Sequence, residues 1–230
     1  MYWFWDSTYY LVALGALICA IASFRVSSTY KKFSNHFSCR GLTSQDVARQ
    51  ILNSAGIFDV RIEMVKGSLT DHYSPNEKVL RLSETVFGST SVAAIGVAAH
   101  ECGHAIQHSV GYFPLKLRSA SVPIANIGSA LSWPLILLGL VLGYTGLSQA
   151  GILLFLFVVI FQLITLPVEF NASRRALDIL STNGILFDEE LVGAKKVLTA
   201  AAMTYVAALF SSILQLLRLV ILTNRGNRKR

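Results

Sequence analysis

The sequence predicts a mainly α-helical membrane protein in which transmembrane helices carry a small α+β block. Two observations predict this class. Hydrophobic residues make up 53% of the chain and charged residues 14%, against about 25% charged in a typical soluble domain. The charged residues also fall in blocks between long uncharged runs, as in proteins that cross a membrane several times. The composition excludes a disordered chain and argues against a soluble one, and 230 residues allow one compact unit.

Residues 1–25 are predicted to form an N-terminal transmembrane anchor. Eighteen uncharged residues separate Asp6 from Arg25, enough for a minimal span at about 1.5 Å rise per residue. A cleaved signal peptide would need a basic stretch before its apolar core, and residues 1–10 contain no Lys or Arg. We therefore expect an anchor that stays attached.

Residues 26–118 are predicted to form a polar α+β block with two helices. The first covers the amphipathic segment QDVARQILNSAG, which Thr43 or Ser44 caps and Gly56 ends. The second is rich in small residues and runs from about Ser91 to His108. Between them, the segments VRIEMV and KVLRLS alternate as strands do. They flank a turn-rich segment, KGSLTDHYSPNE, and so predict a small β hairpin.

Residues 119–168 are predicted to form a transmembrane hairpin. These fifty positions contain no charge, which is too long for one span and suits two, with a turn at residues 143–146. Residues 169–230 should hold a helix, then a buried or membrane-embedded helix over 197–217, then a basic tail.

Basic residues predict the orientation, because cytoplasmic loops carry the excess of Lys and Arg. Eleven lie between Arg25 and Arg118, and none lies before the first span or in the hairpin tip. The N-terminus should therefore be outside and the polar block cytoplasmic. The tail NRGNRKR is also basic, so three spans, with 197–217 not crossing, agree with the rule better than four.

The second predicted helix of the polar block contains His100-Glu101-Cys102-Gly103-His104. Two histidines four residues apart project from one helix face, so both imidazoles can reach one zinc ion. Glu101 lies next to the first of them, where its carboxylate can take a proton from a zinc-activated water. Burying these groups in so apolar a helix would be costly without a partner. The motif therefore predicts metal-dependent hydrolysis of a peptide bond.

A third histidine ligand is not available near the motif. His108 lies about 12 Å along the helix axis from His100 and cannot share its metal ion. A metzincin would have its Gly and third His where this chain has Gln107 and Val110. The three cysteines form no C-x-x-C pair, so a cysteine-based metal site is not indicated either.

A glutamate is then the economical third ligand, and Glu169 is our candidate. It follows the predicted hairpin and should lie in the first turn of a helix begun by Pro167. Two spans separate Glu169 from His104, so the two residues would lie on the same, cytoplasmic side of the membrane. An ion pair with Arg174 or Arg175 is the alternative role. Other possible ligands are Asp178, Glu189 and Glu190.

Peptide hydrolysis also needs a donor for the oxyanion that forms in the reaction. The candidates for this role or for substrate contact are Tyr205, His72, Arg174 and Arg175. For His72, which lies in a turn-rich segment, a structural role in the turn is favoured.

The chain resembles the bacterial membrane zinc metallopeptidases of the YugP type, related more distantly to the HtpX and CAAX-prenyl endopeptidase gluzincins. The resemblance is carried by LTDHYSPNEKVLRLSE, SVAAIGVAAHECGHAIQH, LPVEFNASRRAL and TYVAALFSSILQLLRLV, and covers most of the chain. It implies a gluzincin-like catalytic block fused to transmembrane helices. It also implies one zinc ion per chain, with His100, His104 and Glu169 as ligands and Glu101 as base. HtpX-type relatives have an acidic residue where this chain has Ser173, which leaves the partner of the first histidine open.

The motif and the resemblance together predict a membrane-bound zinc metalloendopeptidase. It would be a multi-pass protein of the bacterial cell membrane with its active site on the cytoplasmic side. We expect a polypeptide substrate and the lipid bilayer as partners, and no nucleic acid; the sequence indicates no oligomeric state.

Two other functions are open. A site-2-type intramembrane protease would need the motif helix within the bilayer and a Leu-Asp-Gly motif, but the nearest string here is Leu177-Asp178-Ile179. A non-enzymatic membrane scaffold with a structural zinc would not need Glu101.

Overall fold

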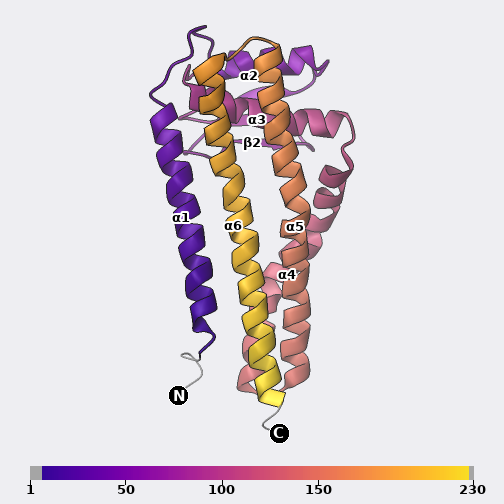
Figure 1. The fold of residues 1–230 in the computed structure, drawn as a ribbon. Helices are drawn as coiled ribbons and strands as arrows, with labels where there is room; N and C mark the ends of the chain where they lie inside the picture. Colours follow the sequence, from indigo (N-terminus) through magenta and orange to yellow (C-terminus); the bar gives the residue numbers. More distant parts are fainter. Residues whose placement is uncertain (1–6, 228–230) are drawn as a thin grey trace. The chain divides into compact units, whose positions relative to one another are not determined.

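The computed structural model describes residues 7–227. In this part of the chain it confirms the predicted class: long helices dominate, and there is one small sheet (Figure 1). The elements in chain order are α1 (Tyr9–Phe33), α2 (Ser44–Ser54), β1 (Arg61–Val65), β2 (His72–Ser74), β3 (Val79–Ser83), α3 (Val92–Ser109), α4 (Phe113–Val141), α5 (Thr145–Thr182) and α6 (Asp188–Asn227). They divide into two compact units, described here one at a time.

The first unit is a bundle of apolar helix segments. It contains the chain up to Ser23, then Leu117–Leu166, and the chain from Thr204 on. Small residues let its helices approach closely. A Cβ atom on Gly15 of α1 would lie 2.6 Å from Ser211 Oγ of α6, and similar tight contacts join α4 to α5 at Gly128 and Gly151. Such small-residue contacts are typical of helices that pack within membranes.

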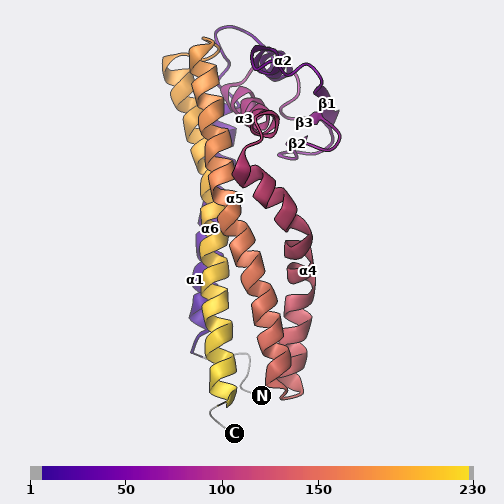
Figure 2. The same cartoon turned by 90° about the vertical axis from the view of Figure 1, so that its right-hand side faces the viewer.

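Within this unit, the last part of α6 lies beside the first part of α1. The Arg218 guanidinium is 5.4 Å from the centre of the Tyr9 ring, and the two helix ends lie at the same end of the bundle in both views (Figures 1 and 2). By length and composition α6 is a candidate span, as are α1, α4 and α5. Four helices are therefore candidates where the sequence favoured three.

The helix expected to begin at Pro167 does not begin there. α4 and α5 are joined by a turn over residues 142–144, and α5 then continues through Pro167 to Thr182. Proline removes one backbone hydrogen bond from a helix interior, but the long apolar segment before it holds the helical conformation on both sides. Glu169 consequently lies far inside a 38-residue helix rather than in a first turn.

The second unit contains Phe24–Lys116 and Pro167–Met203. Its helices α2 and α3 begin where the sequence predicts. Thr43 caps α2 by accepting a hydrogen bond from the Asp46 N–H (3.3 Å), and Ser91 caps α3 in the same way at Ala94 (3.2 Å). Both predicted helix starts are confirmed. A capping residue and the spacing of apolar residues are properties of the segment itself, so local sequence is enough to predict them.

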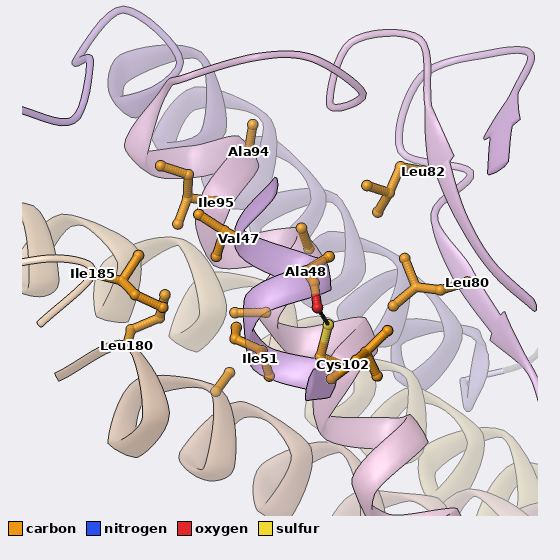
Figure 3. Packing of buried hydrophobic residues seen from close by; sticks show 14 of the residues in the cluster. Val47, Ala48, Ile51, Leu80, Leu82, Ala94, Ile95, Cys102, Leu180 and Ile185 are labelled. Carbon is orange, nitrogen blue, oxygen red and sulfur yellow. Dashed lines mark hydrogen bonds between the residues drawn. The ribbon is translucent and has the colours of Figure 1, made fainter. Parts of the chain in front are cut away.

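The core of this unit forms where α2, α3 and β3 meet the C-terminal end of α5 (Figure 3). Val47 and Ile51 of α2 are fully buried, as are Leu80 and Leu82 of β3. Cys102 of α3 lies among them, with its thiol 3.6 Å from the carbonyl oxygen of Ala48. Other members of this cluster include Ala94, Ile95, Leu180 and Ile185. One face of the motif helix is therefore anchored in the core.

The sheet differs from the predicted hairpin. Its strand order is β1-β3-β2, with β1 parallel and β2 antiparallel to β3 (Figure 2). The two predicted strands thus pair in parallel. The hairpin that does form uses β2, a three-residue strand inside the segment expected to be a turn. Such a strand is too short to show alternation, and β3 becomes the buried central strand.

Candidate metal centre

His100 and His104 lie one turn apart on α3, and Glu169 reaches them from α5. Glu169 Oε2 is 3.3 Å from His100 Nε2 and 3.7 Å from His104 Nε2. One ligand atom from each of the three residues lies within 4.8 Å of the other two. The two rings meet nearly at right angles, with their centres 4.7 Å apart. Both Nε2 atoms therefore face a common carboxylate.

The cluster is largely shielded from water. Glu169 is 2% exposed, and the side chains of His100 and His104 are 16% and 12% exposed. A carboxylate taken out of water needs a positive partner or several hydrogen bonds.

Gly103 allows the two helices to come this close. A Cβ atom at this position would lie 2.6 Å from the carbonyl oxygen of Ala172 on α5, closer than real Cβ atoms approach. Ala172 follows Glu169 by three residues, so this contact lies about one turn from the carboxylate. The glycine in the motif therefore has a structural reason that spacing alone does not reveal.

Each histidine has a partner at its other ring nitrogen. Ser173 Oγ lies 3.1 Å from His100 Nδ1, and Gln107 Oε1 lies 3.1 Å from His104 Nδ1. Ser173 thus makes the contact that the sequence left open. Gln107 was not identified from the sequence as a partner of His104. Its side chain is held in this position by residues on α5 some sixty positions away in the chain, and no local pattern shows that contact.

The electrostatic surroundings of His104 favour its charged form. Burial by itself lowers the pKa of His104. The neighbouring Glu169 carboxylate, the charge of Glu101 and the contact with Gln107 act in the opposite direction and hold the pKa above its ordinary value. The surroundings of His104 therefore favour a positive charge at this position.

The donor set fits a zinc ion. Two imidazole nitrogens and one carboxylate oxygen are among the ligand sets of catalytic zinc sites, which keep a fourth position open. Both Nδ1 atoms already have hydrogen-bond partners, so the Nε2 atoms, which face Glu169, are the nitrogens that would bind a metal. Among the described residues with a placed side chain, this is the one group of at least three possible metal ligands.

The other predicted site residues have varied surroundings. Glu101 is buried, with 8% exposed, and lies on α3 between the two histidines. His72 is on β2, where its Nδ1 contacts the Thr70 carbonyl oxygen at 2.8 Å. Arg175 donates through Nε to Asn171 Oδ1 (2.8 Å), whereas Arg174 is exposed. Tyr205 belongs to the first unit.

His108 and the alternative ligands lie in other surroundings. His108 Nδ1 contacts the Tyr73 hydroxyl at 2.9 Å. Glu190 accepts a hydrogen bond from the Cys39 N–H at 2.7 Å. Neither these nor Asp178 joins the group of possible ligands among the residues that the structure describes.

Comparisons with known proteins agree with this description. A family model described as "Putative neutral zinc metallopeptidase" matches residues 8–224. The "Putative membrane protease YugP" of Bacillus subtilis (strain 168) is 47% identical over 205 residues, which cover 89% of this chain and 91% of that protein. No solved structure matches the chain.

Proposed function

Because the chain belongs to the family of putative neutral zinc metallopeptidases, we propose that it is a membrane-bound zinc metalloendopeptidase. The observation that carries this proposal is the convergence of His100, His104 and Glu169 around one point. These residues come from two helices and from positions up to 69 apart in the chain, and they supply the donor types that zinc prefers.

His100, His104 and Glu169 would hold the zinc ion, one per chain. Zinc supplies Lewis acidity, which lets water act as a nucleophile near neutral pH. Glu101, next to His100 in the chain, is the general base: it accepts a proton from the attacking water and delivers it to the leaving amine nitrogen. The C–O bond forms, the C–N bond breaks, and a carboxylate and an amine result. Stabilisation of the oxyanion falls to a donor among His72, Tyr205, Arg174 and Arg175.

The active site lies on the cytoplasmic side of a bacterial cell membrane in this proposal. Its support is the charge distribution: eleven basic residues from Arg25 to Arg118 and none before the first span. The substrate is a polypeptide reachable from that side.

An intramembrane protease of the site-2 type is less well supported. Such an enzyme needs its motif helix within the bilayer. Here α3 is not among the four candidate spans, and it is capped by Ser91 and packed on α2 and β3. A helix capped by a serine and packed against a small sheet is typical of a folded block outside the bilayer.

The proposal is tested with full-length protein in detergent and a library of fluorescence-quenched peptides. Glu101→Gln should keep bound zinc but lower kcat/KM by at least about 10²- to 10⁴-fold, because it loses the general base. Glu169→Ala should lose zinc itself, measured by mass spectrometry of the metal, while Asp178→Ala should retain it.

Near-normal turnover by Glu101→Gln would show that the assigned base is wrong. Wild-type protein that binds zinc and cleaves no peptide of the library would favour the scaffold function instead.

A further inference from the structure

Gln107 is a polar side chain without any exposed surface, and every polar atom of its amide has a partner. Its Nε2 donates to the carbonyl oxygen of Val168 (2.8 Å) and to Asn171 Oδ1 (3.0 Å). Its Oε1 lies 3.1 Å from His104 Nδ1. The amide of Gln107 thus links His104 on α3 to the segment of α5 that carries Glu169.

The chemistry of these partners determines which way the amide points. A backbone carbonyl such as that of Val168 can only accept a hydrogen bond. Asn171 is oriented in turn by Arg175, whose guanidinium can only donate and whose Nε lies 2.8 Å from Asn171 Oδ1. Both partners of the Gln107 nitrogen are therefore acceptors. The amide oxygen must be the atom that faces His104.

An oxygen at this place requires a proton on His104 Nδ1. A neutral imidazole carries one ring proton, and the other nitrogen then has a free lone pair. A zinc ion held between Nε2 and Glu169 (3.7 Å) would take the lone pair of Nε2 and leave the ring proton on Nδ1. With the proton on Nε2, two buried acceptors, Nδ1 and Gln107 Oε1, would oppose each other without a hydrogen bond, which is unfavourable.

The first histidine has no such constraint. Its Nδ1 contacts the Ser173 hydroxyl, which can donate or accept. The two zinc ligands on α3 are therefore held differently: His100 by an adaptable hydroxyl and His104 by an amide whose orientation is determined by acceptors on α5.

We propose that Gln107 is a positioning residue that accepts a hydrogen bond from His104 Nδ1 and so orients the ring with Nε2 towards the metal site. The proposal rests on the zinc site of the proposed function. The hydrogen bond to Val168, the residue before Glu169, also ties the third ligand's helix turn to α3. Gln107 touches neither substrate nor metal and acts through these two neighbours.

The first test compares wild type with Gln107→Leu in zinc-loaded, ¹⁵N-histidine-labelled full-length protein, where Nε2 would bind the metal and the ring proton would lie on Nδ1. His104→Ala assigns the signals. The proposal expects the Nδ1 signal of His104 to move in Gln107→Leu, because the acceptor of its hydrogen bond is gone. The same Nδ1 signal in both proteins would overturn the proposal.

The second test compares zinc affinity by chelator competition. Gln107→Leu should bind zinc about 10- to 100-fold more weakly than wild type, the usual effect of losing the partner of a ligating histidine. Gln45→Leu is the matched control. The buried amide oxygen of Gln45 has no hydrogen-bond partner among the described residues, so the zinc affinity of this variant should equal that of wild type.

An affinity of Gln107→Leu within about twofold of wild type would contradict the proposal. Both readouts are independent of proteolysis. If Gln107→Leu weakens zinc binding as expected but the wild-type protein cleaves no peptide, the proposed function is refuted and the role of Gln107 remains.

Discussion

Single residues of this chain differ in chemistry mainly through burial and through the charges beside them. Glu169 is a carboxylate with almost no exposed surface, and it is held beside two imidazoles. The cysteines show the same principle outside the site. Cys102 is buried in the core of the second unit, whereas Cys39 is exposed beside Glu190. Their reactivities should therefore differ.

Alkylation should distinguish the two thiols in the folded protein. Burial holds the pKa of Cys102 far above its ordinary value, and no reagent reaches it, so it should react only after denaturation. The Glu190 carboxylate raises the pKa of Cys39. Because the thiolate is the reactive form, the rate at Cys39 should rise with pH through this raised pKa, measured by peptide mass spectrometry.

Glu190→Gln removes the negative charge and should lower the pKa of Cys39, so that alkylation at neutral pH becomes faster while Cys102 stays protected. Equal labelling of Cys39 and Cys102 in the folded wild-type protein would contradict the packing described for α3.

Among the helices, the approach of α3 to α5 determines the geometry of the candidate site. Two features of the sequence enter this contact. Gly103 removes the side chain that would meet Ala172, and the continuation of α5 through Pro167 places Glu169 and Ser173 on successive turns of one helix. Glu169 and Ser173, the partner of His100, are therefore carried by one continuous helix.

Gly103→Ala should destabilise the protein and weaken zinc binding. The added Cβ would meet backbone atoms of Ala172 at 2.6 to 3.1 Å, and overpacking costs about 1–3 kcal/mol. This exceeds the roughly 1 kcal/mol that alanine gains over glycine in a helix. Thermal unfolding in detergent and zinc competition measure the two effects.

Gly96→Ala is the control on the same helix. Its Cβ would lie 3.4 Å from Ala194 Cβ, an ordinary contact, so this variant should be as stable as wild type or slightly more stable. The opposite order of stability for the two variants would show that α3 and α5 are not in close contact at Gly103.

For the whole molecule, the question is how many times the chain crosses the membrane. α6 shares the apolar bundle with α1, and their contacts at Gly15 with Ser211 and at Tyr9 with Arg218 place the two helices at equal depth. If α1 crosses with its N-terminus outside, α6 then ends outside as well. This arrangement favours four spans and places the basic tail outside, against the charge rule.

Cysteine labelling in a cysteine-free background tests this directly. Single cysteines at Ser68, Gly146 and Asn227 are treated with an impermeant thiol reagent on intact cells and on inverted vesicles. Four spans predict labelling of Gly146→Cys and Asn227→Cys from outside and of Ser68→Cys from inside. Labelling of Asn227→Cys from inside would restore three spans, and labelling of Ser68→Cys and Gly146→Cys from one side would overturn both topologies.

Much of this protein could be read from local sequence. The caps at Thr43 and Ser91, the strands over β1 and β3 and the uncharged runs of the apolar helices follow from the preferences and solvation of short segments. The motif on α3 likewise places His100 and His104 on one face, because helical spacing is a local property. The choice of Glu169 as their third neighbour came from elimination and chain order.

The tertiary structure decided what depends on contacts between distant segments. The parallel pairing of β1 with β3, the helix that continues through Pro167, and the Ser173 and Gln107 contacts of the histidines all join parts of the chain that no local pattern connects. Their energies come from packing and from satisfying buried polar groups, and these exist only after the chain has folded. Residue types and their spacing therefore pointed to the histidines of the candidate metal centre, whereas the arrangement of these side chains with Glu169 is a property of the folded molecule.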